Sequence, residues 1–232
     1  MRQKMSLGLR SSGLLIAAAM VGAPLVAVAE PPPLFAPVTA TPKAPDAEGF
    51  LQRWLVLEPI VKPNRSNTGF TGTYVRQALM APYFPDQFGP VPRNGQTETV
   101  AGTPLAWRAV DTNLFDVKLF DFAQDLGKPT YGVIFWAVTV VNSPREMAGV
   151  RLAVGSNSAS MWWVNGREAA GLFGDRRMVM DDVVSPPLTL HKGPNIVRGA
   201  VINGPGLSDF CVRFVDAGGQ PVRDITLTTR GS

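Results

Sequence analysis

A β-hairpin is indicated most clearly by residues 161–169, which read Met161-Trp162-Trp163-Val164-Asn165-Gly166-Arg167-Glu168-Ala169. An Asn-Gly pair between two apolar runs is the strongest short-range hairpin signal, because both residues tolerate a positive φ angle. Neighbouring strand residues point to opposite faces of a sheet, so at most one of Trp162 and Trp163 can fill the space between two sheets. The stretch therefore predicts two antiparallel strands with one tryptophan on each face.

Similar strand signals surround this hairpin along most of the chain. Short apolar runs rich in β-branched and aromatic residues alternate with Gly, Pro, Asn and Asp, which is the pattern of strands and turns. Helical periodicity is confined to residues 73–80, where Pro82 ends it. The predicted strands are residues 51–57, 107–110, 131–141, 150–154, 160–164, 188–190, 196–202 and 210–215. The predicted fold class is all-β, an antiparallel β-sandwich of two sheets packed face to face.

The first 29 residues have the pattern of a cleavable signal peptide. Three basic residues precede an apolar stretch at residues 14–28, which ends in the small residues Ala27-Val28-Ala29. Cleavage is expected before Glu30. The alternative of an uncleaved anchor is disfavoured, because a Gly and a Pro interrupt the stretch and it is shorter than the roughly 20 residues that span a bilayer. We expect a secreted or periplasmic protein with no membrane span after cleavage.

Composition divides the remaining chain into two parts. Residues 30–49 are rich in Pro and Ala and are expected to form a tether, whereas residues 50–232 are expected to form one β-sandwich domain. Cleavage removes three of the 22 Lys and Arg, which leaves 19 basic residues beside 18 acidic ones. A nearly neutral chain does not support a nucleic-acid partner. The lone Cys211 cannot form an internal disulfide, so the fold must rest on packing.

Four segments follow one another in a characteristic order. They are residues 131–144, residues 150–156, the hairpin Trp163-Val164-Asn165-Gly166, and residues 190–195, which read Leu-His-Lys-Gly-Pro-Asn. This order resembles the galactose-binding-like jelly-roll modules attached to bacterial glycoside hydrolases and carbohydrate esterases. Residues 54–59 are similar to their opening strand, with Glu58 where a glycine is common. The resemblance covers residues 50–216 and implies a jelly-roll β-sandwich with a role in carbohydrate recognition.

Two candidate ligand-binding surfaces follow from the aromatic and planar polar residues. A bound sugar needs an aromatic face for its apolar side and planar groups for its hydroxyls. The resemblance matches Trp163 with a buried tryptophan, which leaves Trp162 as the better surface candidate of the two, although the core is still the favoured position for Trp162. The segment 83–90 is the second candidate, and it could equally be a lid over a sheet edge. The candidate ligand-binding residues are Trp162, Phe173, Arg176, Arg177, Tyr83 and Phe84.

A metal site built from His and Cys is excluded by supply, because the chain has one residue of each kind. Calcium remains open, since Asp175, Asp181 and Asp182 lie in one loop and oxygen ligands suit a hard cation. The alternative is a solvated acidic loop that faces Arg176 and Arg177. No other cofactor is expected.

Catalysis has little support in the sequence. A Ser-His-Asp hydrolase would need His191, the only histidine, as its base, and the chain has no Gly-x-Ser-x-Gly elbow. A two-carboxylate glycosidase depends on spacing that residue counts do not show. The predicted function is a secreted non-catalytic module that recognises a glycan or docks to a carbohydrate-active partner. The alternatives are a structural or interaction subunit of a bacterial envelope or extracellular assembly, and a small secreted hydrolase.

Overall fold

The computed structural model describes residues 33–63, 69–174, 176–204 and 206–230. The predicted signal peptide and Asp175 lie outside these ranges. The strands are β1 (Phe35–Ala36), β2 (Arg53–Leu57), β3 (Ile60–Val61), β4 (Thr97–Val100), β5 (Thr103–Thr112), β6 (Val133–Ser143), β7 (Met147–Ser156), β8 (Ala159–Val164), β9 (Arg167–Leu172), β10 (Val183–Val184), β11 (Leu188–Leu190), β12 (Gly193–Asn203), β13 (Phe210–Val215) and β14 (Thr226–Thr228). The helices are α1 (Gly72–Met80) and α2 (Leu119–Asp125). This content confirms the predicted all-β class.

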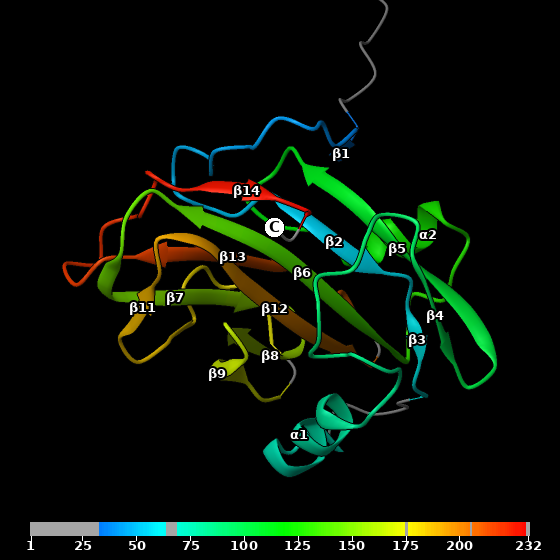
Figure 1. Cartoon of the computed structure of the whole chain (residues 1–232). Helices are drawn as coiled ribbons and strands as arrows, with labels where there is room; N and C mark the ends of the chain where they lie inside the picture. Colours follow the sequence, from blue (N-terminus) through cyan, green and yellow to red (C-terminus); the bar gives the residue numbers. More distant parts are fainter. Residues whose placement is uncertain (1–32, 64–68, 175, 205, 231–232) are drawn as a thin grey trace, which may run out of the picture. The chain divides into compact units, whose positions relative to one another are not determined.

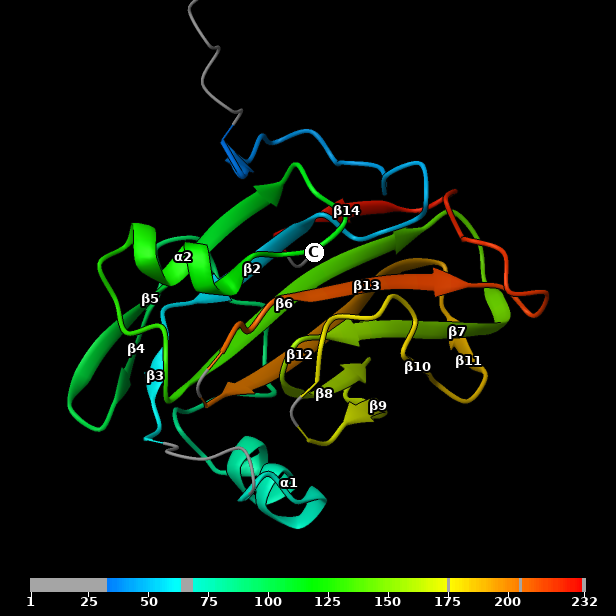
Figure 2. The same ribbon diagram turned by 180° about the vertical axis from the view of Figure 1, so that it is seen from behind.

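The strands form two antiparallel sheets (Figure 1). In the large sheet the order is β1-β5-β2-β6-β12-β8-β9, with β3 and β14 also paired to β6 and β4 paired to β5. In the small sheet β7 pairs with β10, β11 and β13. Figure 2 shows β7 and β13 lying in front of β6 and β12. The predicted antiparallel β-sandwich is therefore confirmed.

A core of apolar side chains fills the space between the two sheets. Both sheets contribute to it, through alternate residues of each strand, as the two-residue period requires. Its larger members are Trp54, Phe135, Leu152, Trp162, Phe210 and Phe214. The chain holds its sheets together by packing, and Cys211 is a buried free thiol.

A second core covers part of the opposite, outer face of the large sheet. The helix α1 lies against this face, as its buried residues Val75, Ala78 and Leu79 show. The Thr71 side chain accepts a hydrogen bond from the Tyr74 N–H at the start of α1, which supplies one of the donors that a helix N-terminus leaves without a partner. The predicted helix at residues 73–80 is thus confirmed, and it adds a third layer to the sandwich.

Trp162 and Trp163 lie on opposite faces of β8, as the two-residue period predicts, and Trp162 takes the core position rather than the surface position considered for it. Trp162 is fully buried between the sheets, where its ring centroid lies 4.9 Å from that of Phe210. Trp163 is buried on the outer face and stacks on Trp136, with ring centroids 5.6 Å apart. Neither faces solvent, because the outer face is covered as well. Gly199 on β12 makes room for Trp162, since a Cβ there would lie 2.2 Å from the indole ring.

The described residues 33–49, the expected tether, lie against the domain. The strand β1 pairs with β5, and the Lys43 N–H donates to the Leu227 carbonyl at 3.0 Å. Arg53 forms a two-point ion pair with Asp111, with both bonds at 2.8 Å, and donates to the Thr41 carbonyl at 2.5 Å. Backbone pairing and the buried guanidinium of Arg53 therefore attach residues 33–49 to the β-sandwich. Within the described ranges, neither helix has the length and hydropathy of a membrane span.

Candidate functional site

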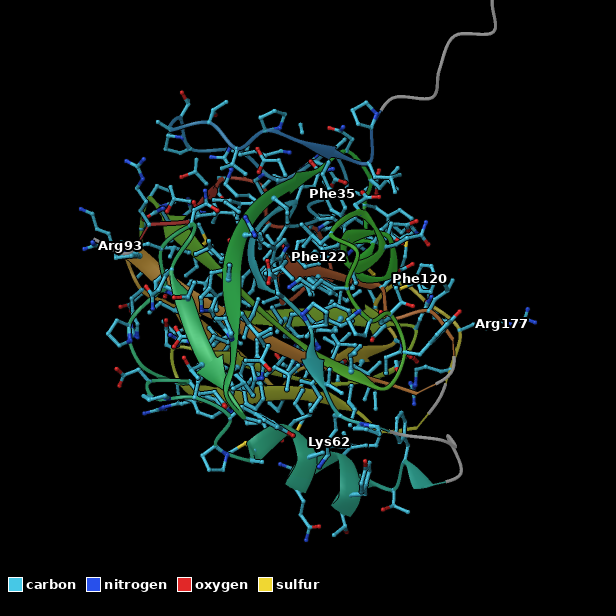
Figure 3. The ribbon with its side chains drawn as sticks, turned by 90° about the vertical axis from the view of Figure 1, so that its right-hand side faces the viewer. Phe35, Lys62, Arg93, Phe120, Phe122 and Arg177 are labelled. Carbon is cyan, nitrogen blue, oxygen red and sulfur yellow. The ribbon has the colours of Figure 1, made fainter. Side chains whose placement is uncertain are left out.

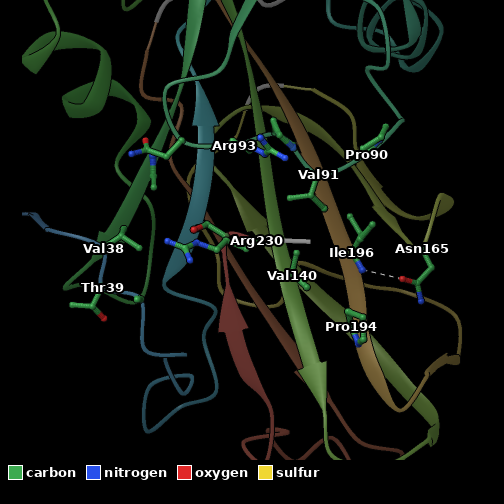
Figure 4. Close-up of a pocket in the computed structure, with 15 residues that line it drawn as sticks. Val38, Thr39, Pro90, Val91, Arg93, Val140, Asn165, Pro194, Ile196 and Arg230 are labelled. Carbon is green, nitrogen blue, oxygen red and sulfur yellow. Dashed lines mark hydrogen bonds between the residues drawn. The ribbon is translucent and has the colours of Figure 1, made fainter. Parts of the chain in front are cut away.

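A groove of about 910 Å³ lies on the part of the large sheet's outer face that α1 leaves uncovered (Figure 4). Its floor is aliphatic and comes from three strands of the sheet: Ala109 on β5, the buried Val140 on β6, and Ile196 on β12. Val140 continues the alternation that places Ile134, Trp136 and Val138 in the outer core. The groove is thus the exposed continuation of the covered half of the same face, and its volume is in the range of natural ligand sites.

Loops from four separate parts of the chain form the rim of the groove. The N-terminal segment, the loop before β4, the hairpin turn between β8 and β9, and the residues after β14 all contribute. The rim residues from these loops are Val38, Thr39, Ala40, Pro90, Val91, Pro92, Arg93, Asn94, Asn165, Thr229 and Arg230, and Pro194 of β12 lies beside them. Loops that a rigid sheet positions are a common place for recognition.

The two rim asparagines are held by backbone groups of the floor. The Asn94 Oδ1 accepts a hydrogen bond from the Ala109 N–H at 2.9 Å. The Asn165 Oδ1 accepts from the Ile196 N–H at 2.9 Å, and its Nδ2 donates to the Asn195 Oδ1 at 2.9 Å. Asn165 has a φ of 51° and Gly166 a φ of 77°, as the predicted Asn-Gly turn requires. These bonds tie the rim to the strands and fix its geometry.

Segment 83–92 closes one end of the groove and covers the sheet beyond it. Phe84 packs edge-on against Trp107 and Trp136, and Phe88 lies 5.1 Å from Trp163 between ring centroids. Residues 83–90 thus lie as in the lid alternative, although they cover the face of the sheet and not an edge. Its last residues become the rim of the groove.

Arg198 on β12 fastens this lid to the sheet. Its guanidinium is buried, forms no ion pair among the described residues, and donates to the carbonyls of Gly89 and Pro90. Burial lowers the pKa of this guanidinium, which nevertheless stays charged, because an arginine does not lose its proton in a protein. The charge is thus compensated by carbonyl dipoles of the lid.

Replacing Arg198 by Met should release the lid while keeping most of the buried volume. Two carbonyls lose a charged donor, so the free energy of unfolding should fall by about 1.5–3 kcal/mol. Amide hydrogen exchange over residues 83–92 should accelerate, whereas an Arg177→Met control, at an exposed position, should leave it unchanged. Unaltered exchange in the Arg198 variant would contradict this role.

The six residues predicted to bind ligand do not meet around the groove. Trp162 is in the core between the sheets, Phe84 is in the outer core, and Tyr83 is half-buried with its hydroxyl donating to the Ala78 carbonyl at 2.7 Å. The guanidinium of Arg76 lies 5.4 Å from the ring centroid of Phe173. Arg177 is exposed and points away from the domain (Figure 3). Burial removes Trp162, which has no exposed surface, as a direct sugar contact.

The predicted acidic loop is occupied by ion pairs. Asp182 pairs with Arg176, and Asp181 pairs with Arg213 on β13. In the described residues, which omit Asp175, no cluster of three metal-ligating side chains is present. Of the two arginines expected to face this loop, Arg176 does so, whereas the partner of Asp181 is Arg213 and not Arg177.

His191 and Cys211 do not form a catalytic arrangement with their described neighbours. The exposed His191 Nδ1 lies 3.9 Å from the Glu146 Oε2, and the pocket beside it has no serine or cysteine among its lining residues. Burial raises the pKa of the Cys211 thiol to about 12, so it does not supply a thiolate at neutral pH.

The groove residues had no recognisable signal in the sequence. Arg93 and Asn94 stand before a short polar strand, Thr39 lies in a Pro-rich segment, and Arg230 is close to the end of the chain. Asn165 is the one groove residue that the sequence singled out, and it did so as part of the predicted Asn-Gly turn. Pairing of β1 with β5 and of β14 with β6 brings the segments of Thr39 and Arg230 to the groove.

No family model matches this chain, and no curated protein matches its sequence. Among solved structures, it is similar to the PA14 sugar-binding domain from an RTX adhesin, with 15% identity and a TM-score of 0.44 over 78% of this chain and 100% of the other. It is also similar to the PA14 domain of the antifreeze protein MpAFP, with 13% identity and a TM-score of 0.41 over 83% and 95%. A family 35 carbohydrate binding module from an environmental isolate has 11% identity and a TM-score of 0.30 over 79% and 98%. Likeness of this degree says nothing about what this chain binds.

Proposed function

We propose that this chain is a secreted or periplasmic, non-catalytic module that binds a glycan in the groove. The observation that carries the proposal is the groove itself: an open site on a rigid sheet, with an aliphatic floor and planar polar groups at its rim. A sugar ring presents apolar C–H groups and hydroxyls, which such a surface can satisfy together. Residues that line the groove include no aromatic side chain, so the half-buried Ala109 and Ile196 would contact the apolar side of the sugar. The galactose-binding-like identity rests on the order of sequence motifs and belongs to the same proposal.

Ala109→Met tests the position of the site, because a longer side chain on the half-buried floor should occupy space that the ligand needs. We expect retention on a panel of soluble polysaccharides in native affinity electrophoresis, weakened about tenfold by the substitution, or about 1.4 kcal/mol. Ala148→Met is the matched control, since Ala148 is an exposed strand residue of the small sheet.

Either of two results would overturn the glycan site. If no polymer in the panel is retained, the proposed function fails. If both alanine variants bind as the wild type does, the ligand binds elsewhere than the groove.

A second candidate function is a subunit of an envelope or extracellular assembly. The observation that favours it is a row of exposed apolar residues, Val179, Met180 and Val184, in and beside β10. Apolar groups that gather on a surface are typical of protein interfaces. A stable oligomer in size-exclusion chromatography, together with no retention on polysaccharide, would favour this function over glycan binding.

A further inference from the structure

From the charges at the rim we infer that the groove selects an acidic polysaccharide, whose carboxylates are bound by Arg93 and Arg230. The inference rests on the proposed glycan function and names the chemical class of the ligand. A neutral-sugar site would need only the amides and hydroxyls that the rim also carries. A neutral sugar would therefore not account for the guanidinium groups of Arg93 and Arg230 at the rim.

Both arginines reach the groove from segments far apart in the sequence (Figure 4). Arg93 lies in the loop before β4, where its backbone N–H donates to the Gln96 Oε1 at 3.1 Å. Arg230 follows β14, where its carbonyl accepts from the Thr228 hydroxyl at 3.2 Å. Backbone bonds thus hold both residues, while both side chains are exposed.

No acidic partner in the described chain neutralises these two charges. The ion pairs between described residues involve other cations: Arg53, Arg76, Arg108, Lys118, Lys128, Arg145, Arg176, His191 and Arg213. The residues that line the groove include no Asp or Glu. The groove consequently carries a local positive charge on a chain whose predicted mature form has 19 basic and 18 acidic residues.

A carboxylate is the chemical partner that this arrangement fits. A guanidinium presents a planar fork of N–H donors that matches the two oxygens of a carboxylate, and such charge-assisted bonds are stronger than neutral ones. The uronic acid residues of a polysaccharide carry one carboxylate on each ring. A site with two separated guanidinium groups would bind two carboxylates of one polymer at the same time, while the aliphatic floor contacts the rings.

The test compares polymers that differ only in charge. We would measure binding of the full mature chain to polygalacturonate and alginate, and to the same two polymers after reduction of their carboxyl groups to alcohols. Arg93→Gln and Arg230→Gln should each weaken binding to the acidic polymers by about ten- to a hundredfold, because each removes a charge-assisted contact. Arg177→Gln is the matched control, since it removes one positive charge at an exposed position outside the groove.

Lysine variants and salt provide a second test of the contacts between the arginines and the carboxylates. Arg93→Lys and Arg230→Lys keep the charge but lose the fork, so they should bind more weakly than the wild type and more tightly than the Gln variants. Raising NaCl from about 0.05 M to about 0.5 M should weaken binding to the acidic polymers. The added salt shortens the distance over which the arginines and the carboxylates attract each other.

Failure of this inference can be told apart from failure of the glycan function. If the reduced or neutral polymers bind as tightly as the acidic ones, the chain is a glycan-binding module but does not select acids. If Arg177→Gln weakens binding as much as the groove variants do, the attraction is a general charge effect and the assignment of the two arginines is overturned. If no polymer binds, both proposals are overturned.

Discussion

Replacing Lys118 by Met is expected to lower the free energy of unfolding by about 3–5 kcal/mol, which is the usual cost of leaving buried charges without their partner. The Lys118 Nζ lies 2.8 Å from the Asp116 Oδ2 and 3.0 Å from the Asp209 Oδ2. Both carboxylates are buried, and the second oxygen of each has no hydrogen-bond partner among the described residues. One ammonium group therefore compensates two buried acids.

The same three residues join two distant parts of the chain. Next to them, the Val117 N–H donates to the Phe210 carbonyl at 2.8 Å, where the segment before α2 meets the start of β13. Without the lysine, the two acids would repel each other at this junction. We therefore expect the loss to appear as global destabilisation in urea, with a lower midpoint and an unchanged slope.

The difference in the free energy of unfolding between the wild type and the Lys118 variant should become smaller as the pH falls. Burial raises the pKa of Asp209 above its ordinary value of 3.8, while hydrogen bonding to Lys118 acts to lower it. A raised pKa means that the folded state holds the proton more tightly, so the contribution of this group is complete below 3.8 and is lost as the pH rises through the folded-state pKa. Removing Lys118 should raise that pKa further, so acid should partly restore the variant.

Lys128→Met is the matched control for this prediction. Lys128 also contacts a buried carboxylate, with its Nζ 3.0 Å from the Glu58 Oε2, but Glu58 keeps a second cation in Arg108 at 2.7 Å. The control should thus lose less stability than the Lys118 variant. Equal losses in the two variants, or a Lys118 deficit independent of pH, would contradict the assignment of a shared ammonium.

Trp162→Ala is expected to cost about 3–5 kcal/mol in the free energy of unfolding, because it leaves a cavity in the core between the sheets. The indole packs against Trp54 and Phe210 with centroid distances of 6.0 and 4.9 Å, and its Nε1 donates to the Ser160 Oγ at 3.0 Å. Gly199 offers no side chain to fill the cavity. The loss of stability can be measured by thermal unfolding, monitored through near-ultraviolet circular dichroism.

Comparison with Trp162→Phe separates packing from recognition. The phenyl ring keeps most of the buried apolar area, so this control should lose less stability than the alanine variant. Neither substitution should change the affinity of the folded fraction for polysaccharide, since Trp162 has no exposed surface. A Trp162→Ala protein that unfolds at the wild-type temperature but no longer binds polysaccharide would show that the core position is incorrect.

Several elements could be predicted because their signals are local. The predicted strands at residues 188–190 and 210–215 match β11 and β13, and the predicted helix at residues 73–80 matches α1 within one residue. The helix α2 has only seven residues, and β4 reads Thr-Glu-Thr-Val, so neither carries a clear apolar period. β4 forms because the turn at Ala101 and Gly102, both with positive φ, folds it back on β5.

The candidate site could not be predicted in the same way. Its floor residues look like ordinary strand residues, and its two arginines stand far apart in the sequence. Arg230 reaches the rim only because β14 pairs with β6, and Arg93 only because its loop follows the lid that Arg198 holds. Contacts of this kind depend on pairing between strands and leave no periodic trace in the chain.

The sequence by itself determined that Trp162 and Trp163 lie on opposite faces of one strand, since the two-residue period and the Asn165-Gly166 turn are properties of the local backbone. Only the tertiary structure decided which face each tryptophan takes and that neither is exposed. The physical reason is that a side chain is buried by whatever packs over it. The small sheet covers one face, and α1 with the segment 83–92 covers part of the other, which leaves Ala109 and Ile196 half-exposed on the floor of the groove.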